Sequence, residues 1–433
     1  RRLIFPFLPI AVARLQDQGK RSPGRSCSPK GGVDFLRGFD IFGPMNAYGR
    51  YSRAACLFSL LLVLPIASHA DAIADLKAAW AKYDASRDSA DAAAHVEAAR
   101  EVLDVGREVL PAGNERLPIL MLNYAKALNR ALELPEAREA AEEALAAAEA
   151  IYNKDSIELL DYWITLGDIF GSLRSESLQS RAYRKALKLV AGHHGKESEA
   201  YGDLAMDAGF KLFVANRSNR SSRLFRQAIN AYETSLGATS PKTVAAGLSL
   251  GRVEYQLGNY AAAEKQLSQG LPTLVAGGPE LAESEMKVRA LLVQILERQG
   301  KSEAATEHCV AIGRLNSASE DAEFQPLYRE APRYPLSMLQ TGTQGHVDME
   351  FTVDESGFVR DVVILNTVTK RPKGRKRIAG NATSAEAAAG GSGEAFEAAA
   401  LAAVSNFRYA PRIVDGEATA TADVKTRITF RIE

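Results

Sequence analysis

The chain has 433 residues, of which 46% are hydrophobic and 24% charged, so it falls in the range of globular proteins and is not disordered throughout. The formal net charge is zero, but residues 1–70 hold ten Lys and Arg against three Asp and Glu. Residues 71–433 therefore hold 43 basic and 50 acidic side chains, a charge near −7, which argues against non-specific binding to nucleic acid.

The first 44 residues start with Arg, are rich in Arg, Gly, Pro and Ser, and have no sustained hydrophobic period. We expect residues 1–44 to be a non-native extension upstream of the true start at Met45. Neither helix nor strand is predicted for this segment.

Residues 45–70 carry the pattern of a secretory signal. Two Arg residues precede an apolar run of 14 residues at 54–67, and small residues follow, which predicts cleavage after Ala70. The alternative is an uncleaved anchor, although the run is shorter than the roughly 20 residues of a membrane-spanning helix. Cys56 lacks the context of a lipoprotein signal, so we predict no lipid anchor. Cys309 then remains as a single thiol, which we expect to be buried in a helix as a small apolar residue.

A repeat is visible in the stretch LGRVEYQLGNYAAAEKQLSQGL at 250–271, where two amphipathic segments are broken at Gly258-Asn259. Small residues recur at a step of 42 residues, from Ala125 to Gly167, Gly209 and Gly251, and each has a second small residue 19 positions later. Gly300 and Ala305 match Gly258 and Ala263 across the same step and indicate a fifth unit. The five units resemble tetratricopeptide repeats of the longer kind found in kinesin light chains. We expect the repeats to fill residues 71–315, with a degenerate sixth unit around Trp80 to Leu110.

Stacked helix pairs of this family form a right-handed superhelix with a concave groove that binds peptides and partner proteins. The candidate groove residues are Asn123, Tyr162, Asp168 and Arg252. The alternative is that they are solvated polar positions on helix faces. His193-His194 lies in a loop between repeats without a third ligand at short spacing, so we predict no metal site and no cofactor.

The hydrophobic period changes from that of helices to that of strands after the repeats. Residues 316–332 are a polar, Pro-containing linker, and two alternating strands follow at 346–353 and 358–365 with a turn between them. A short helix at 393–407 and a last strand at 422–432 complete the order strand, strand, helix, strand. The predicted fold is an all-α solenoid followed by a small α+β domain at 333–433.

The C-terminal segment contains Tyr334-Pro335 before a short helix, Gly342 and Gly345 before the first strand, Gly357 in the hairpin, an Ala-rich helix, Phe407-Arg408-Tyr409 with Pro411, and Gly416. With these motifs it resembles the C-terminal domain of TonB-family proteins. The resemblance implies a periplasmic or outer-membrane protein as partner, such as a TonB-dependent receptor, whose extended segment adds to the sheet.

An open sheet edge can take the strand of another chain. By its position the last strand is the candidate edge. The candidate protein-binding residues are Tyr334 and Pro335 of the motif and Val424, Thr426, Ile428 and Phe430 of that strand. Tyr334-Pro335 could equally serve to fix a turn and the start of a helix.

Two departures from the TonB pattern argue against an energy-transducing role. The membrane helix and Pro-rich spanner of a transducer are replaced by a cleavable signal and helical repeats. A loop is also inserted at 370–394, and its first eight residues, Lys370 to Arg377, contain six Lys and Arg. We expect a solvated loop. The alternative is a basic patch for anionic lipid headgroups or an acidic partner, which is a second route to membrane contact beside an uncleaved signal.

No phosphate-binding Gly-Lys loop, His-Glu-x-x-His helix or Gly-x-Ser-x-Gly elbow occurs in the sequence. The sequence therefore predicts a non-enzymatic, exported interaction protein in the periplasm of a Gram-negative bacterium. The predicted role is an adaptor that holds one partner in the repeat groove and another on the sheet. The alternative is a transducer for TonB-dependent transport, retained at the inner membrane by residues 54–67.

Overall fold

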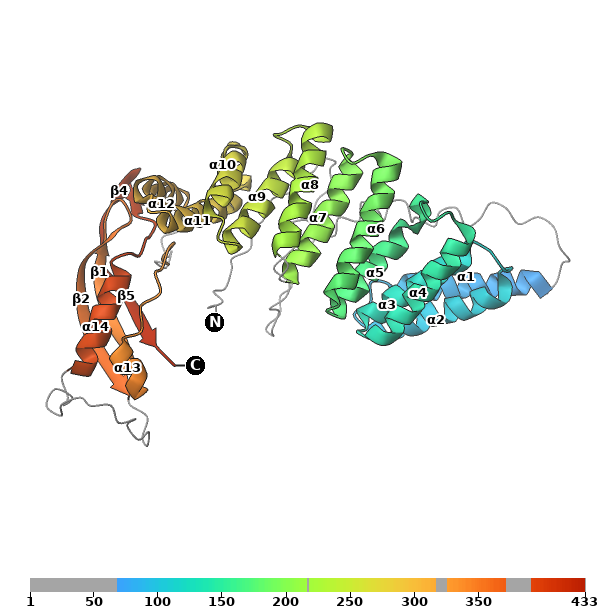
Figure 1. Cartoon of the computed structure of the whole chain (residues 1–433), viewed down its shortest axis with the longest axis horizontal. Helices are drawn as coiled ribbons and strands as arrows, with labels where there is room; N and C mark the ends of the chain where they lie inside the picture. The colour runs from blue at the N-terminus through green and yellow to red at the C-terminus, as the bar shows by residue number, and fades with distance from the viewer. Residues whose placement is uncertain (1–67, 216–217, 317–324, 371–390, 433) are drawn as a thin grey trace, which may run out of the picture. The chain divides into compact units, whose positions relative to one another are not determined.

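The computed structural model describes residues 68–215, 218–316, 325–370 and 391–432 (Figure 1). The predicted upstream extension, the apolar run at 54–67 and most of the inserted loop lie outside these residues. The described chain divides into two compact units, residues 68–258 and residues 259–432. The sequence places the domain boundary in the linker at 316–332, whereas the second compact unit already starts at Asn259 and holds helices and sheet together.

The first unit consists of antiparallel helix pairs that follow one another along the chain, each helix packing against the next (Figure 1). Its helices are α1 (Ser68–Ser86), α2 (Ala92–Val109), α3 (Arg116–Arg130), α4 (Leu134–Ile151), α5 (Leu160–Ser172), α6 (Glu176–His194), α7 (Glu199–Val214), α8 (Ser218–Leu236) and α9 (Pro241–Gln256). A short 3-10 turn at Ile157–Leu159 precedes α5. The pair α1–α2 occupies the place of the predicted sixth unit.

The turn inside each pair explains why the repeat has a fixed length. Leu132, Arg174, Gly258 and Gly300 stand 42 residues apart or a multiple of it, and all four have a positive φ, at 63°, 54°, 79° and 71°. A left-handed residue ends one helix and lets the chain reverse within a few residues. The starts of α7 and α9 repeat in the same phase, because Ser198 and Ser240 each accept a hydrogen bond from the backbone nitrogen three residues on, at 3.2 Å.

The small residues predicted from the 42-residue step lie where two helices approach closely. A Cβ added to Gly167 would lie 2.9 Å from the Tyr183 ring, and one added to Gly209 would lie 2.7 Å from the Phe225 ring. Tyr183 and Phe225 are themselves 42 residues apart and almost completely buried. The glycine in one helix therefore makes room for the aromatic ring from the next helix.

The second unit joins the last helices to the sheet. Its helices are α10 (Tyr260–Ala276), α11 (Ala282–Arg298), α12 (Ser302–Asn316), α13 (Leu336–Thr341) and α14 (Gly391–Val404), with a 3-10 turn at Gly278–Glu280. Its strands are β1 (Gln344–Val353), β2 (Val359–Lys370), β3 (Arg412–Val414), β4 (Glu417–Thr419) and β5 (Thr421–Phe430).

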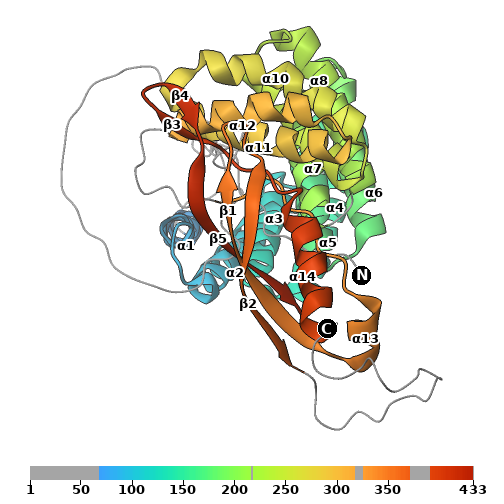
Figure 2. The same ribbon diagram turned by 90° about the vertical axis from the view of Figure 1, so that its left-hand side faces the viewer.

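The main sheet is antiparallel with the order β2-β1-β5, and α14 packs on one face of it (Figure 2). Val347, Met349, Phe351 and Val353 of β1 are each at most 2% exposed, so the predicted alternation is confirmed. The predicted turn is also present, because Asp354 Oδ1 accepts hydrogen bonds from the backbone nitrogens of Ser356 and Phe358 at 3.0 and 2.8 Å.

The strands differ in extent from the prediction. β2 continues to Lys370, five residues beyond the expected end, because Asn366 to Lys370 pair with the start of β1. A second, two-stranded sheet of β3 and β4 was not predicted. Its turn is Asp415-Gly416 with φ values of 51° and 87°, the dipeptide and conformation that favour tight hairpins.

Candidate protein-interaction site

Strand β5 is an edge of the main sheet, as predicted, because β1 is its one neighbour among the described strands. Every second residue of such a strand turns its backbone N–H and C=O away from the sheet. A bulge at Ala422 and Asp423 interrupts the pairing near the start of β5, where Asp423 has a φ of 62°. The open backbone of β5 is therefore available for hydrogen bonding from Val424 onward.

The β5 side chains that were predicted to bind a partner support the strand from the core side, whereas the strand's open backbone lies at the sheet edge. Val424, Ile428 and Phe430 are at most 8% exposed and belong to the core beneath α14, while Thr426 is half-buried. Their side chains hold the strand in place, so binding at this edge would depend on main-chain groups and on the opposite side chains of β5.

Tyr334 also has a structural position. Its ring contacts Phe396 and Phe430 edge to face, with centroids 5.7 Å apart in both cases, and its hydroxyl donates to the backbone oxygen of Thr343. Pro335 stands at the N-cap of α13. The structure thus gives Tyr334-Pro335 a role in fixing the turn and the start of α13.

The open face of the sheet, opposite α14, carries paired charges. Arg427 of β5 donates from Nε and Nη2 to the two carboxylate oxygens of Asp348 at 2.5 and 3.1 Å. Lys425 Nζ lies 3.4 Å from Glu350 Oε2. The hydrogen bond from Arg427 lowers the pKa of Asp348. The carboxylates are on the central strand and the cations on the edge strand.

Arg408, from the Phe407-Arg408-Tyr409 motif, joins the C-terminal α+β domain, which we call the module, to the last helix pair, α11 and α12. Its side chain is 1% exposed, and Nη1 donates to Glu297 Oε1 of α11 at 2.5 Å. Nη2 donates to Thr306 Oγ1 of α12 at 2.7 Å and to the backbone oxygen of Ser356 at 2.9 Å. The guanidinium lies 3.7 Å from the ring centroid of Phe358. One buried cation thus contacts both helices and the β1–β2 hairpin.

The backbone around Arg408 is held from two further sides. Its nitrogen donates to the oxygen of Tyr328 at 3.1 Å, its oxygen accepts from Leu327 at 2.7 Å, and the nitrogen of Tyr409 donates to the oxygen of Gly357 at 2.9 Å. The described end of the predicted linker is therefore a pairing partner of the module and not a free spacer.

Three small residues allow this close contact. Cys309 of α12 is fully buried, as predicted, and its Sγ lies 3.7 Å from Arg408 Nη2. A Cβ on Gly313 would lie 2.4 Å from the oxygen of Pro411, and one on Gly357 would lie 2.2 Å from the oxygen of Tyr409. Burial raises the pKa of the Cys309 thiol to about 11. We call the contact of α11 and α12 with Arg408 and its neighbours the Arg408 junction.

In the first unit, a Lys–Asp pair links each of three steps between odd-numbered helices, α3 to α5, α5 to α7 and α7 to α9. Lys126 Nζ lies 2.6 Å from Asp161, Lys211 Nζ 2.6 Å from Asp168, and Lys242 Nζ 2.6 Å from Asp203. Asp168 also accepts from the Tyr183 hydroxyl. The predicted groove residue Asp168 is therefore engaged in stacking the repeats.

The other predicted groove residues have three different environments. Tyr162 is 3% exposed and lies in the core, so the structure corrects its assignment to the groove. The 42-residue step makes it the counterpart of Leu120 and Leu204, which are also buried. Arg252 is half-buried, and burial lowers its pKa.

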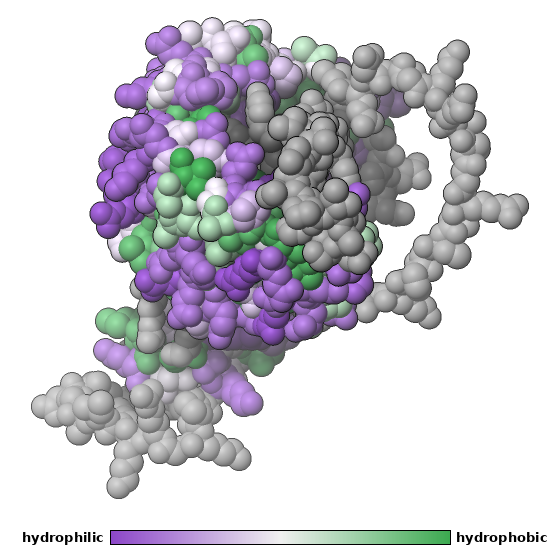
Figure 3. All heavy atoms as spheres, turned by 90° about the vertical axis from the view of Figure 1, so that its right-hand side faces the viewer, coloured by the Kyte–Doolittle hydropathy of each residue, from purple (hydrophilic) through white to green (hydrophobic). Residues whose placement is uncertain are grey.

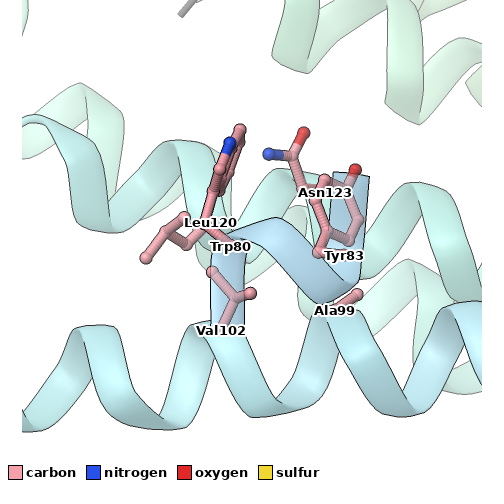
Figure 4. Close-up of a pocket in the computed structure, with 6 residues that line it drawn as sticks. All are labelled: Trp80, Tyr83, Ala99, Val102, Leu120 and Asn123. Atoms are coloured by element: carbon pink, nitrogen blue, oxygen red, sulfur yellow. The ribbon is translucent and has the colours of Figure 1, made fainter. Parts of the chain in front are cut away.

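Asn123 lines a small hollow with Trp80, Tyr83, Ala99, Val102 and Leu120 of α1, α2 and α3. Figure 4 shows its amide beside the Trp80 indole and on the same side as the Tyr83 hydroxyl. Figure 3 shows the apolar surface of the described residues on one face broken into separate patches among hydrophilic ones. Of the four candidates, Asn123 is the one that the structure places at the mouth of a hollow.

The described parts of the chain contain no group of three or more His, Cys, Asp or Glu positioned to hold a metal ion. His193 and His194 lie in the last turn of α6 and not in a loop as predicted, and their ring centroids are 4.6 Å apart in an edge-to-face contact. Among the helices that the structure describes, none combines the length and the apolar character that crossing a membrane requires.

No family model and no curated protein matches the chain. Similar solved structures include BtubC (BKLC) from P. vanneervenii, 15% identical with a TM-score of 0.40, which covers 61% of this chain and 95% of that one. A kinesin light chain with TPR-like repeats from Podosopora anserina is 13% identical with a TM-score of 0.42 and covers 49% and 100%. A tetratricopeptide repeat protein from Parabacteroides merdae is 14% identical with a TM-score of 0.35 and covers 58% and 95%.

These TM-scores, at most 0.42 for the three chains, describe a loose likeness. The assignment of a tetratricopeptide-like solenoid comes from the helix pairs and the 42-residue step of this chain itself. The TonB resemblance stays a prediction from the sequence motifs.

Proposed function

We propose that the protein is a non-enzymatic adaptor of the bacterial periplasm that presents the edge of its C-terminal sheet to an extended segment of another protein. The open β5 edge is the observation that carries this proposal. The sequence resemblance to TonB-family domains adds the class of partner, an outer-membrane receptor. The stacked helix pairs are the proposed seat of a second partner, near Asn123.

The Arg408 junction gives the proposed adaptor a defined geometry. A strand bound at β5 would be held by a module that shares a buried cation with α11 and α12. A bound segment would then have a fixed position relative to α11 and α12, and binding would not carry the entropic cost of ordering a flexible linker.

Strand addition is tested by photocrosslinking in cells of a Gram-negative host that express the full chain. The photoreactive residue benzoylphenylalanine replaces Lys425, Arg427 or Thr429 of β5, and Val368 of β2 or Glu397 of α14 serves as the control position. The proposal predicts adducts from the β5 positions to one extended segment of one partner, mapped by mass spectrometry. Equal adducts at the control positions, or none at β5, would refute it.

The alternative function, energy transduction from the inner membrane, is favoured by the apolar run at 54–67. Intact mass of the protein from periplasmic and membrane fractions separates the two. A periplasmic species that starts at Asp71 supports the adaptor, and a membrane-bound species that keeps Met45 supports the transducer.

A further inference from the structure

The open face of the sheet has an ordered pattern of charge across its strands. In the register of the sheet, Glu350 of β1 stands opposite Val363 of β2 and Lys425 of β5. Two residues along, Asp348 stands opposite Asn366 and Arg427. Each row therefore runs from an uncharged side chain through a carboxylate to a cation at the edge.

The cations at the edge keep hydrogen-bonding capacity after these contacts. Lys425 and Arg427 have side chains 68% and 61% exposed, against 27% and 20% for Glu350 and Asp348. Arg427 uses Nε and Nη2 for Asp348, and its Nη1 has no contact to that carboxylate. A strand added beside β5 would place a side chain directly opposite each cation, at about 4.5–5.5 Å between Cβ atoms.

The two edges of the sheet also differ in charge beside the central carboxylates. In the rows of Glu350 and Asp348, β2 contributes the uncharged Val363 and Asn366, and β5 contributes Lys425 and Arg427. The two β2 cations on this face, Arg360 and Lys370, stand further along the sheet, opposite Thr352 and Gln344. The acidic residue of β5, Asp423, lies in the bulge, where regular pairing is interrupted.

We propose that the β5 edge selects an acidic strand, one that carries Asp or Glu at two positions i and i+2 so that they stand opposite Lys425 and Arg427. The inference rests on the proposed strand addition and names the chemistry of its partner. Alternate positions of the same strand would be apolar or small, because they continue the α14 side of the sheet beside Val424 and Ile428.

The test uses three synthetic nonapeptides that share Val at alternate positions and differ at two central intervening positions, which are both Glu, both Gln or both Lys. Binding to the full-length protein is measured by fluorescence anisotropy at low salt, and hydrogen exchange locates the protected strand. The Glu peptide should bind on the order of tenfold more tightly than the Lys peptide, with Gln between them, and 0.5 M NaCl should reduce the difference.

Two variants make the result specific to the edge cations. In Lys425→Gln/Arg427→Gln the order of the three peptides should collapse to equal affinity. Arg360→Gln/Lys370→Gln changes the same number of charges on β2 and should leave the order intact. The glutamine variants remove the charge and keep a flexible polar side chain, and circular dichroism checks that the sheet is retained.

The possible results distinguish selection of an acidic strand from strand addition itself. Equal binding of all three peptides with protection of β5 would overturn acid selection and leave strand addition standing. Protection of β2 in place of β5, or no binding of any peptide, would overturn both.

Discussion

The two units use the same chemical pair, a cation with a carboxylate, in opposite ways. Between the helices of residues 68–258, Lys126 and Asp161 have side chains 40% and 43% exposed, and Lys211 and Asp168 are both 34% exposed. In the Arg408 junction the cation is 1% exposed and Glu297 10%. Exposed pairs contribute little to stability, whereas leaving a buried charge without its partner is costly.

The difference indicates which contacts fix the arrangement of each unit. The repeats stack through buried apolar residues and glycines, and pairs such as Lys126–Asp161 lie at the surface, whereas Asp203 and Glu254 are the buried carboxylates of two other pairs. The module is fixed by a cation with several acceptors that no apolar contact could replace singly. The largest mutational effects should therefore come from the junction and the smallest from exposed pairs such as Lys126–Asp161.

The largest expected effect comes from Arg408→Ala. It leaves Glu297 buried without a cation and removes the contacts to Thr306 and Ser356, so unfolding of residues 259–432 should be easier by about 3–5 kcal/mol. Urea unfolding followed by hydrogen exchange and mass spectrometry measures this. A cycle with Glu297→Ala should show strong coupling, and additive effects of the two changes would contradict the account.

A smaller loss is expected from Gly357→Ala. The added Cβ would lie 2.2 Å from the oxygen of Tyr409 at a φ of +82°, so we expect a loss of about 2–4 kcal/mol. Gly416→Ala is the matched control, since its φ is +87° but nothing lies within 4 Å. It should cost about 1 kcal/mol. If thermal unfolding showed equal losses, the close packing at the junction would not matter.

In the first unit, Gly167→Ala should cost about 1–3 kcal/mol, because its Cβ would press against the Tyr183 ring. The control is Gly192→Ala in α6, which meets nothing within 4 Å and should stabilise by up to about 1 kcal/mol. Thermal unfolding followed by the fluorescence of Trp80 and Trp163 reports on this unit. A neutral Gly167→Ala would show that the helix pair can separate freely.

The smallest effect is expected from Lys126→Met, which removes an exposed pair with Asp161 and should change the free energy of unfolding by less than about 1 kcal/mol. The same fluorescence signal measures it. A loss as large as that of Arg408→Ala would remove the distinction between the two regions.

The sequence predicted the helix pairs well because one 42-residue step repeats the same turn. Leu132 and Arg174 adopt the same left-handed conformation as Gly258, the position at which a glycine in the sequence indicates the turn. It misplaced Tyr162, although the same step aligns it with two buried leucines. It could not predict the role of Arg408, because Glu297 and Thr306 lie 111 and 102 residues away in the chain. Gly313 and Cys309, small residues in a late helix, were the available signals.

The most direct measurement is the alkylation rate of Cys309 with iodoacetamide at pH 8, in the full chain with Cys27 and Cys56 replaced by Ser. The thiol is buried between α12 and the module, and its raised pKa keeps it protonated. We expect slow labelling that Arg408→Ala accelerates on the order of tenfold or more and that Lys126→Met leaves unchanged. Rapid labelling of the unaltered thiol, or equal rates in all three proteins, would show that the module is not held on α12.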